Sequence, residues 1–190
     1  MMTLLRMLFV ALALLVPGMA LAHVSAAAPS GHLLAGLLHP WTGVDHLLGL
    51  MTLGALIRFA GGAAGRSLLA MAMAGLATGM LAGIGGLLLP ANETLLALSL
   101  LASGLILLLV ADRPRRGLGL LLMACSALHG YVHAVESSGS GFLAGFVISS
   151  VTLIGLGLVV AEISMTPRRM PARVLGAGTV LVALGGLLHL

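Results

Sequence analysis

Two short segments of the chain combine histidine and carboxylate side chains in a pattern that suits a metal ion. The candidate ligands, in chain order, are His39, Asp45, His46, His129, His133 and Glu136. Imidazole and carboxylate groups together suit zinc, nickel, cobalt or iron, and neither segment contains a thiolate for a softer metal. Both segments lie in apolar sequence, where an ionisable side chain costs roughly 2.5–3.5 kcal/mol to insert. The two clusters therefore predict a buried cation site.

The second cluster has helical spacing. His129, His133 and Glu136 stand at positions i, i+4 and i+7, which lie along one face of an α-helix. Taken alone, this pattern is equally typical of histidines that form hydrogen bonds at a helix interface. The first cluster is what favours a metal site over that simpler interpretation.

The first cluster coincides with a predicted break in a helix. Pro40 removes a backbone donor and Gly43 loosens the chain, so a short segment is expected to end at His39. A new helix then begins near Thr42, which we expect to be its N-cap, and Asp45 falls in the first turn. Broken helices at membrane depth are tolerated mainly where they line a site.

Composition defines the class of protein that carries these clusters. Of the 190 residues, 60% are hydrophobic and only 7% are charged, whereas a soluble domain carries about 25% charged residues. We therefore expect an all-α membrane protein. The net charge of +4 comes from arginines in short interhelical stretches, not from a basic face, so nucleic acid is not an expected partner. The single cysteine, Cys125, gives no support for redox chemistry.

The chain is expected to begin with a cleavable leader. Arg6 precedes a short apolar core, and Ala20-Leu21-Ala22 fits the small-x-small cleavage rule. Residues 1–22 are therefore predicted to be a signal peptide and residues 23–190 a transmembrane helical domain. An uncleaved first helix is the alternative, although the apolar core is shorter than the ~20 residues that a span needs.

Six further apolar segments are long enough to cross the membrane. They are predicted at about Gly43–Phe59, Ser67–Leu89, Glu93–Val110, Gly117–Val135, Gly141–Ile163 and from Ala172 to the C-terminus. Every arginine after the leader lies in or beside the first, third or fifth loop, and the positive-inside rule makes that side the cytoplasm. Both mature termini and both clusters then lie toward the outer side of the membrane.

Three other residues rank lower as ligands. Glu93 lies at the outer start of a span, where it is equally suited to a helix N-terminus. His23 would follow the cleaved leader, and His32 lies one or two turns before His39. Gly75, Gly79 and Gly83 recur every four residues and predict a close helix contact with no chemical role.

The two clusters resemble the signature motifs of the HupE/UreJ family. The first reads His39-Pro40-x-x-Gly43-x-Asp45-His46, and the second reads His129-Gly130-x-x-His133-x-x-Glu136. The resemblance covers the whole mature chain, including the number of spans. It implies a secondary permease that imports Ni²⁺ or Co²⁺ for hydrogenase or urease maturation. It also implies that the metal, with Zn²⁺ as a further candidate, is cargo bound by the six ligands and that no prosthetic group is needed.

Two alternatives to a permease stay open on the residues themselves. An intramembrane zinc hydrolase would use three of the ligands and an open position for water, with Ser126 as a nearby hydroxyl. A haem protein would use His46 and His133 as axial ligands. The chain has no G-x-x-x-x-G-K-[ST] motif, so no nucleotide partner is expected. The oligomeric state is open, a homo-oligomer included.

Overall fold

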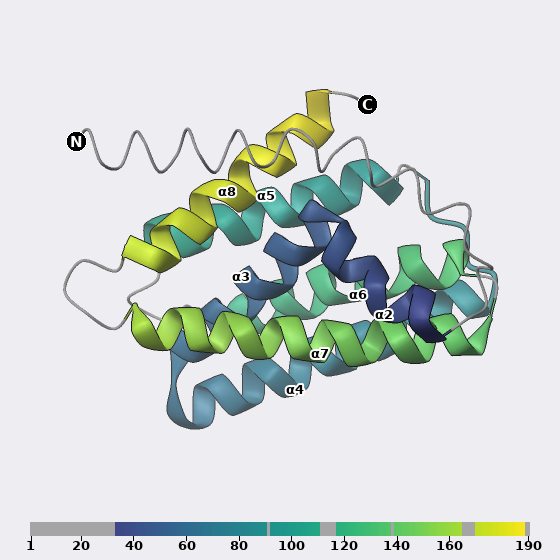
Figure 1. Ribbon diagram of the computed structural model, residues 1–190, viewed down its shortest axis with the longest axis horizontal. Coiled ribbons are helices and arrows are strands. Elements are labelled where there is room, and N and C mark those ends of the chain that lie inside the picture. The colour runs from purple at the N-terminus through teal and green to yellow at the C-terminus, as the bar shows by residue number, and fades with distance from the viewer. Residues whose placement is uncertain (1–32, 91, 111–116, 138, 165–169, 189–190) are drawn as a thin grey trace.

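The computed structural model describes residues 33–90, 92–110, 117–137, 139–164 and 170–188, and within them every regular element is an α-helix. In chain order these helices are α2 (Leu33–Thr42), α3 (Val44–Ala60), α4 (Gly62–Ile84), α5 (Asn92–Val110), α6 (Leu118–Glu136), α7 (Ser140–Ile163) and α8 (Met170–Leu188). Figure 1 shows them gathered into one bundle. The predicted leader, His23 and His32 lie outside the described residues.

The all-α membrane class expected from the sequence is confirmed. Four helices, α4, α6, α7 and α8, are long and apolar enough to cross a membrane, and the bent pair of α2 and α3 passes the same test as one unit. The apolar part of α5 is shorter and runs from Glu93 to Leu109. With α5 counted, these units are the six apolar segments that the sequence predicts, the first of them broken.

The bounds predicted for α4 are wrong by five residues at each end. The apolar run suggests Ser67–Leu89, but the helix runs from Gly62 to Ile84. Gly61 and Gly62 have positive φ angles of 63° and 47°, and Gly86 has 78°. Such angles are readily adopted only by glycine, so these residues turn the chain sharply at both ends. Hydropathy carries no signal for this effect, because glycine and alanine continue the apolar run.

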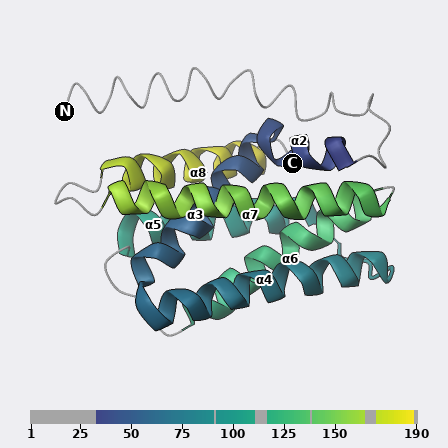
Figure 2. The ribbon, with the colours of Figure 1, turned by 60° about the horizontal axis from the view of Figure 1, so that its bottom comes forward.

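The closest helix pair is α4 with α6, and small residues bring it together. A Cβ atom placed on Gly75 would collide with the carbonyl of Met123, and one on Gly79 with the carbonyl of Ala127. Gly130 of α6 meets the carbonyl of Leu76 in the same way. Figure 2 shows the two helices lying side by side below α7. The predicted role of the glycine stripe, close packing, is confirmed.

Glycine also fixes the position of α7 against both halves of the broken helix. A side chain on Gly36 of α2 would overlap the carbonyl of Phe142, and one on Gly145 would overlap the carbonyl of Leu33. Farther along α7, Gly157 lies against the carbonyl of Met51 in α3. The two halves are therefore held on one common support, α7.

The chain bends by 81° between α2 and α3. The predicted break is confirmed, but two details of the prediction are wrong. The short helix does not end at His39, because α2 continues past Pro40 to Thr42. Thr42 is not the N-cap of the next helix, because its hydroxyl donates back to the carbonyl of His39 at 3.0 Å. Gly43 occupies the N-cap position and offers no side chain for capping.

The arginines within the described residues mark one end of the bundle. Arg58 lies in the last turn of α3 and forms an ion pair with Glu162 near the end of α7. Arg66 lies in the first turns of α4, and Arg173 lies near the start of α8. All three helix ends belong to the same side of the bundle, which the positive-inside rule predicts to be the cytoplasmic one.

We expect Gly79→Ala to destabilise the bundle, because its methyl group would force the α4 backbone away from the carbonyl of Ala127. Overpacking of this kind costs about 1–3 kcal/mol. The matched control is Gly155→Ala in α7, where an added Cβ meets nothing within 4 Å. Alanine is a better helix former than glycine, so the control should be neutral or more stable by up to about 1 kcal/mol. Thermal unfolding in detergent measures both, and equal midpoints for the two variants would contradict the packing argument.

Candidate metal centre

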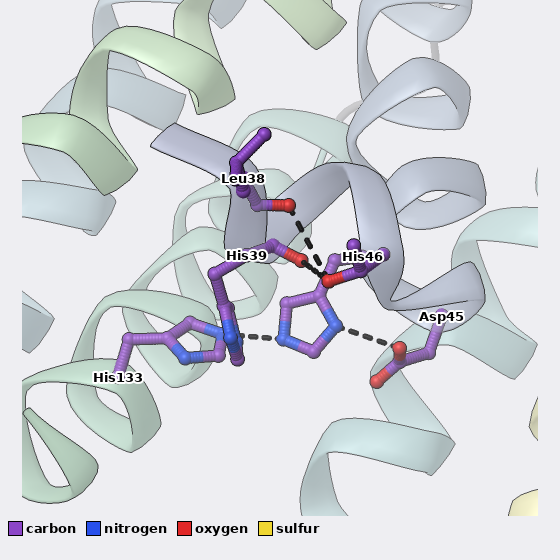
Figure 3. A network of polar contacts seen from close by, with 6 residues as sticks. Leu38, His39, Asp45, His46 and His133 are labelled. Atoms are coloured by element: carbon purple, nitrogen blue, oxygen red, sulfur yellow. Dashed lines mark hydrogen bonds and ion pairs between the residues drawn. The ribbon is translucent and has the colours of Figure 1, made fainter. Parts of the chain in front are cut away.

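Three imidazoles from three helices converge at the bend between α2 and α3. His39 lies near the end of α2, His46 in the first turn of α3, and His133 in the last turn of α6. Their ligand nitrogens all lie within 4.8 Å of one another, and the Nε2 atoms of His46 and His133 are 2.5 Å apart. Two nitrogens bound to one metal at about 2.0–2.1 Å lie at most about 4.2 Å apart. The trio therefore needs only a small adjustment to bind one ion. Figure 3 shows the three rings gathered at one point.

Asp45 does not join the three rings but orients one of them. Its Oδ1 atom accepts a hydrogen bond from Nδ1 of His46 at 2.6 Å. Because Nδ1 then carries the proton, the lone pair of a neutral His46 lies on Nε2, the atom that faces His133. A carboxylate behind a ligating histidine is a common device for fixing the tautomer and raising the basicity of the ring. Figure 3 shows Asp45 on the far side of the His46 ring from His133.

Gly43 provides the space for this carboxylate–histidine pair. A Cβ atom at this position would lie 2.7 Å from Nδ1 of His46 and 3.0 Å from Oδ1 of Asp45. Gly43 has ordinary extended torsion angles, so its lack of a side chain matters for space and not for backbone freedom. Any larger residue would push the pair apart.

The third ring is held from two directions. His39 makes edge-to-face contacts with the rings of His46 and His133, at centroid distances of 5.1 and 4.7 Å. Its Nε2 atom is buried and has no hydrogen-bond partner among the described residues. Trp41, two residues later, donates to Ser149 of α7 at 3.3 Å and thereby helps to keep the end of α2 in place.

The trio lies in a dry setting. His133 is 1% exposed and His46 is 8% exposed, and Phe146 of α7 covers the His133 ring at a centroid distance of 4.3 Å. Phe142 lies against His39 at 5.4 Å. His46 and His133 are therefore shielded from water, whereas His39 is partly exposed. These aromatic covers were not anticipated from the sequence, although both lie on α7 four residues apart.

His129 lies outside the trio, one helical turn deeper in α6. Its Nδ1–H donates to the carbonyl of Cys125 at 2.9 Å, and its ring centroid is 5.9 Å from that of His46. The spacing argument placed His129 and His133 on one face, but only His133 reaches both His39 and His46. The Nε2 atom of His129 is buried without a hydrogen-bond partner in the described part of the chain.

The remaining candidate ligands are placed less closely or lie outside the described residues. Glu93 is exposed in the first turn of α5, where a carboxylate suits the helix N-terminus. Glu136 is the last residue of α6, and its side chain is not among those described. Within the described chain the candidate metal ligands that converge are therefore three histidines, His39, His46 and His133.

Fold and site together define an all-helical, multi-pass membrane protein with a trio of histidines, two of them buried, at a broken helix. The chain belongs to the HupE/UreJ family, because the model of that family, described as HupE / UreJ protein, matches residues 10–188. It is similar to Protein HupE from Rhizobium leguminosarum bv. viciae, with 34% identity over 174 residues that cover 89% of this chain and 90% of the relative. No solved structure matches the chain. Members of the family are transporters and not enzymes, and they are associated with nickel and cobalt transport for hydrogenase and urease maturation.

The family and the geometry of the trio argue against the two alternatives to a permease, the zinc hydrolase and the haem protein. Membership in a family of transporters contradicts the hydrolase. The haem alternative needs an iron between His46 and His133, with nitrogens about 4 Å apart at bond lengths near 2 Å. Those nitrogens are 2.5 Å apart, and the two rings lie in contact at a centroid distance of 4.4 Å. A porphyrin does not fit between them.

We expect Asp45→Asn to weaken Co²⁺ binding by about 10–100-fold, because the amide no longer fixes the tautomer of His46 by charge. The matched control is Thr152→Val in α7, whose hydroxyl bonds only to its own helix, at the carbonyl of Ile148. Equilibrium titration of purified protein in detergent measures both affinities. An unchanged affinity in Asp45→Asn would show that the carboxylate has no part in positioning His46.

Proposed function

We propose that this chain is a secondary transporter that imports Ni²⁺, or Co²⁺ as the closest alternative, across the bacterial inner membrane. The imported ion would supply a hydrogenase or urease maturation system. The protein would carry no prosthetic group, and the metal would be its cargo. Membership in the HupE/UreJ family supports the transport class, and the histidine trio supports a transition metal as the ion.

The observation that carries this proposal is the meeting of both motifs at one point. His39 and His46 come from the first motif and His133 from the second. His46 and His133, which are in contact, are 87 positions apart in the sequence. Three neutral imidazoles suit nickel, zinc and copper better than magnesium or calcium, which prefer oxygen. The trio would therefore select a transition metal from the more abundant hard cations.

The trio would be the entry position. His46 lies in the first turn of α3 and His133 in the last turn of α6, at the bundle end opposite Arg58 and Arg66. If the arginine end faces the cytoplasm, the trio faces the periplasm, as do both ends of the mature chain. The membrane potential then drives a divalent cation inward by about 4.6 kcal/mol per 100 mV.

The bend would be the moving part. His39 and His46 lie on opposite sides of the 81° bend, so a change of this angle changes the distance between two ligands. Capture of an ion by all three rings would stabilise one angle, and a change of angle would weaken the site and let the ion move on. No ATP-binding motif occurs in the sequence, so the energy source we propose is the gradient of the ion itself together with the potential.

We expect His46→Ala to abolish most Ni²⁺ uptake, because it removes the ring that contacts both other histidines. In proteoliposomes with an internal metal-sensitive dye, the initial rate should fall by at least about 10–100-fold, the loss typical of a disturbed metal site. The control is Leu98→Ala, a truncation of an exposed side chain on α5, which should transport at the normal rate. Parallel measurements with Co²⁺ and Zn²⁺ identify the preferred metal. Normal uptake by His46→Ala would rule out the trio as the entry position.

A further inference from the structure

The end of α2 that carries His39 is supported by α7 and not by the helix that follows it. Only Gly43 separates α2 from α3, yet α2 packs mostly against α7 and much less against α3 (Figure 2). The ring of His46 is oriented by Asp45 of its own helix, whereas Nε2 of His39 has no hydrogen-bond partner among the described residues. The place of the His39 ring therefore depends on what holds the backbone of α2.

Pro40 weakens α2 at the turn that carries His39. It lies inside α2, one residue after His39, and it has no N–H group. The carbonyl of Gly36, four residues before Pro40, therefore receives no helix hydrogen bond from it. The last turn of α2 is attached to the preceding turn by fewer bonds than an ordinary helical turn. Support for His39 has to come from outside its own helix.

Ser149 of α7 gives this support with a single hydroxyl group. The hydroxyl donates to the carbonyl of Leu37 at 2.5 Å, and its oxygen accepts the indole N–H of Trp41 at 3.3 Å. These two residues stand two positions before and two positions after His39. Ser149 thus bridges the turn from which Pro40 removes a bond. Its side chain is 3% exposed, so water competes little for either contact.

The hydrogen bonds of Ser149 differ from those that hydroxyl groups usually make in membrane helices. Such groups often bond back to a carbonyl of their own helix, and Ser99, Ser103 and Thr152 do so here. A hydroxyl of that kind satisfies itself and leaves neighbouring helices unaffected. Ser149 instead gives its proton to α2 and accepts one from α2. Its contacts therefore act on the position of another helix.

Ser149 also belongs to a face of α7 that lies against α2 and the trio. The face consists of Phe142, Gly145, Phe146 and Ser149, at positions i, i+3, i+4 and i+7. Phe142 lies against the ring of His39, and Phe146 lies against the ring of His133. Gly145 lets the backbone of α2 approach closely. One face of α7 thus contacts two of the three rings and the helix that carries His39.

We propose that Ser149 is the positioning residue for His39, because it clamps the last turn of α2 to α7 and holds this ring within reach of His46 and His133. A ring that is already in place loses less freedom when an ion binds, so the clamp raises the affinity of the trio for metal. Ser149 acts through His39 and is not itself a ligand. This role rests on the proposed binding of a transition metal by the trio.

Co²⁺ titration of the full-length protein in detergent tests the effect on affinity. We expect Ser149→Ala to weaken binding by about 10-fold, the lower end of the loss seen when a residue that orients a ligand is removed. Trp41 is exposed, so its N–H can bond to water in this variant, which should fold normally. The matched control is Thr152→Val on the same helix, which should bind Co²⁺ with unchanged affinity. An unchanged affinity in Ser149→Ala would overturn the proposal.

A double-mutant cycle separates positioning of His39 from a general effect on the fold. In a His39→Ala background, Ser149→Ala should cause no further loss of Co²⁺ affinity, because the ring that it positions is gone. A general loosening of the bundle would weaken binding by the same factor in both backgrounds. Equal losses would therefore show that Ser149 does not act through His39.

The fluorescence of Trp41, the only tryptophan among the 190 residues, reports on the clamp directly. Without metal, its steady-state anisotropy should fall in Ser149→Ala and stay unchanged in Thr152→Val. Saturating Zn²⁺, a d¹⁰ ion, should restore the anisotropy in Ser149→Ala, because His39 then ties α2 to the other two rings. It should not do so in Ser149→Ala/His39→Ala. Normal anisotropy of metal-free Ser149→Ala would overturn the clamp even where His39→Ala binds Co²⁺ too weakly for the cycle.

These measurements keep the failure of the clamp apart from that of the proposed function. If the unsubstituted protein binds Co²⁺ but takes up no Ni²⁺ in proteoliposomes, the transport function fails, and the titrations still decide the role of Ser149. If it binds neither Co²⁺ nor Zn²⁺, the trio fails as a metal site and the positioning role fails with it. A fall in the metal-free anisotropy of Ser149→Ala would then show only that Ser149 holds α2 in place.

Discussion

Close contact between helix backbones is the constraint on which the rest of this structure depends. Lipid gives helices little hydrophobic reason to associate, so packing of small residues against carbonyls has to hold them. Gly36 and Gly157 set α2 and α3 against α7, and Gly79 sets α6 against α4. At these contacts the backbones touch directly, so neither helix can shift or rotate without a collision. The histidines are therefore placed to within ångströms by residues that have no chemistry of their own.

The broken helix could be predicted from the sequence, but which of the candidate histidines would meet could not. His129 and His133 share one helix face, and spacing alone makes them equivalent. Depth and rotation of α6 decide between them, and both depend on contacts such as that of Gly130 with the carbonyl of Leu76, 54 positions away. Long-range contacts of this kind leave no pattern in a local stretch of sequence. Hydropathy records composition, so it predicted which segments are apolar helices. It could not predict the ends of α4, because those are set by backbone turns at glycines.

The break also shows why residue type is an incomplete guide to role. Threonine is a good N-cap, yet Thr42 turns its hydroxyl back to His39, and the chain bends one residue later at Gly43. The bend has to fall there because only glycine leaves space for the contact between Asp45 and His46. Local capping preference is worth about 1 kcal/mol, and a collision with the hydrogen-bonded pair of Asp45 and His46 outweighs it. The position of the break thus follows from the space that this pair of side chains needs.

The serines that line the cavity beside His129 could be understood as ordinary features of membrane helices. Serine hydroxyls often bond back to their own helix, and this explains Ser99 and Ser103 completely. It does not explain Ser126 or Nε2 of His129, which are buried with no partner in the described chain. Each unsatisfied group costs about 1–3 kcal/mol, and alanine or leucine would avoid that cost at both positions. One water molecule in the adjoining cavity of about 20 Å³ would offset the cost, because it can donate to Nε2 of His129 and accept from the hydroxyl of Ser126.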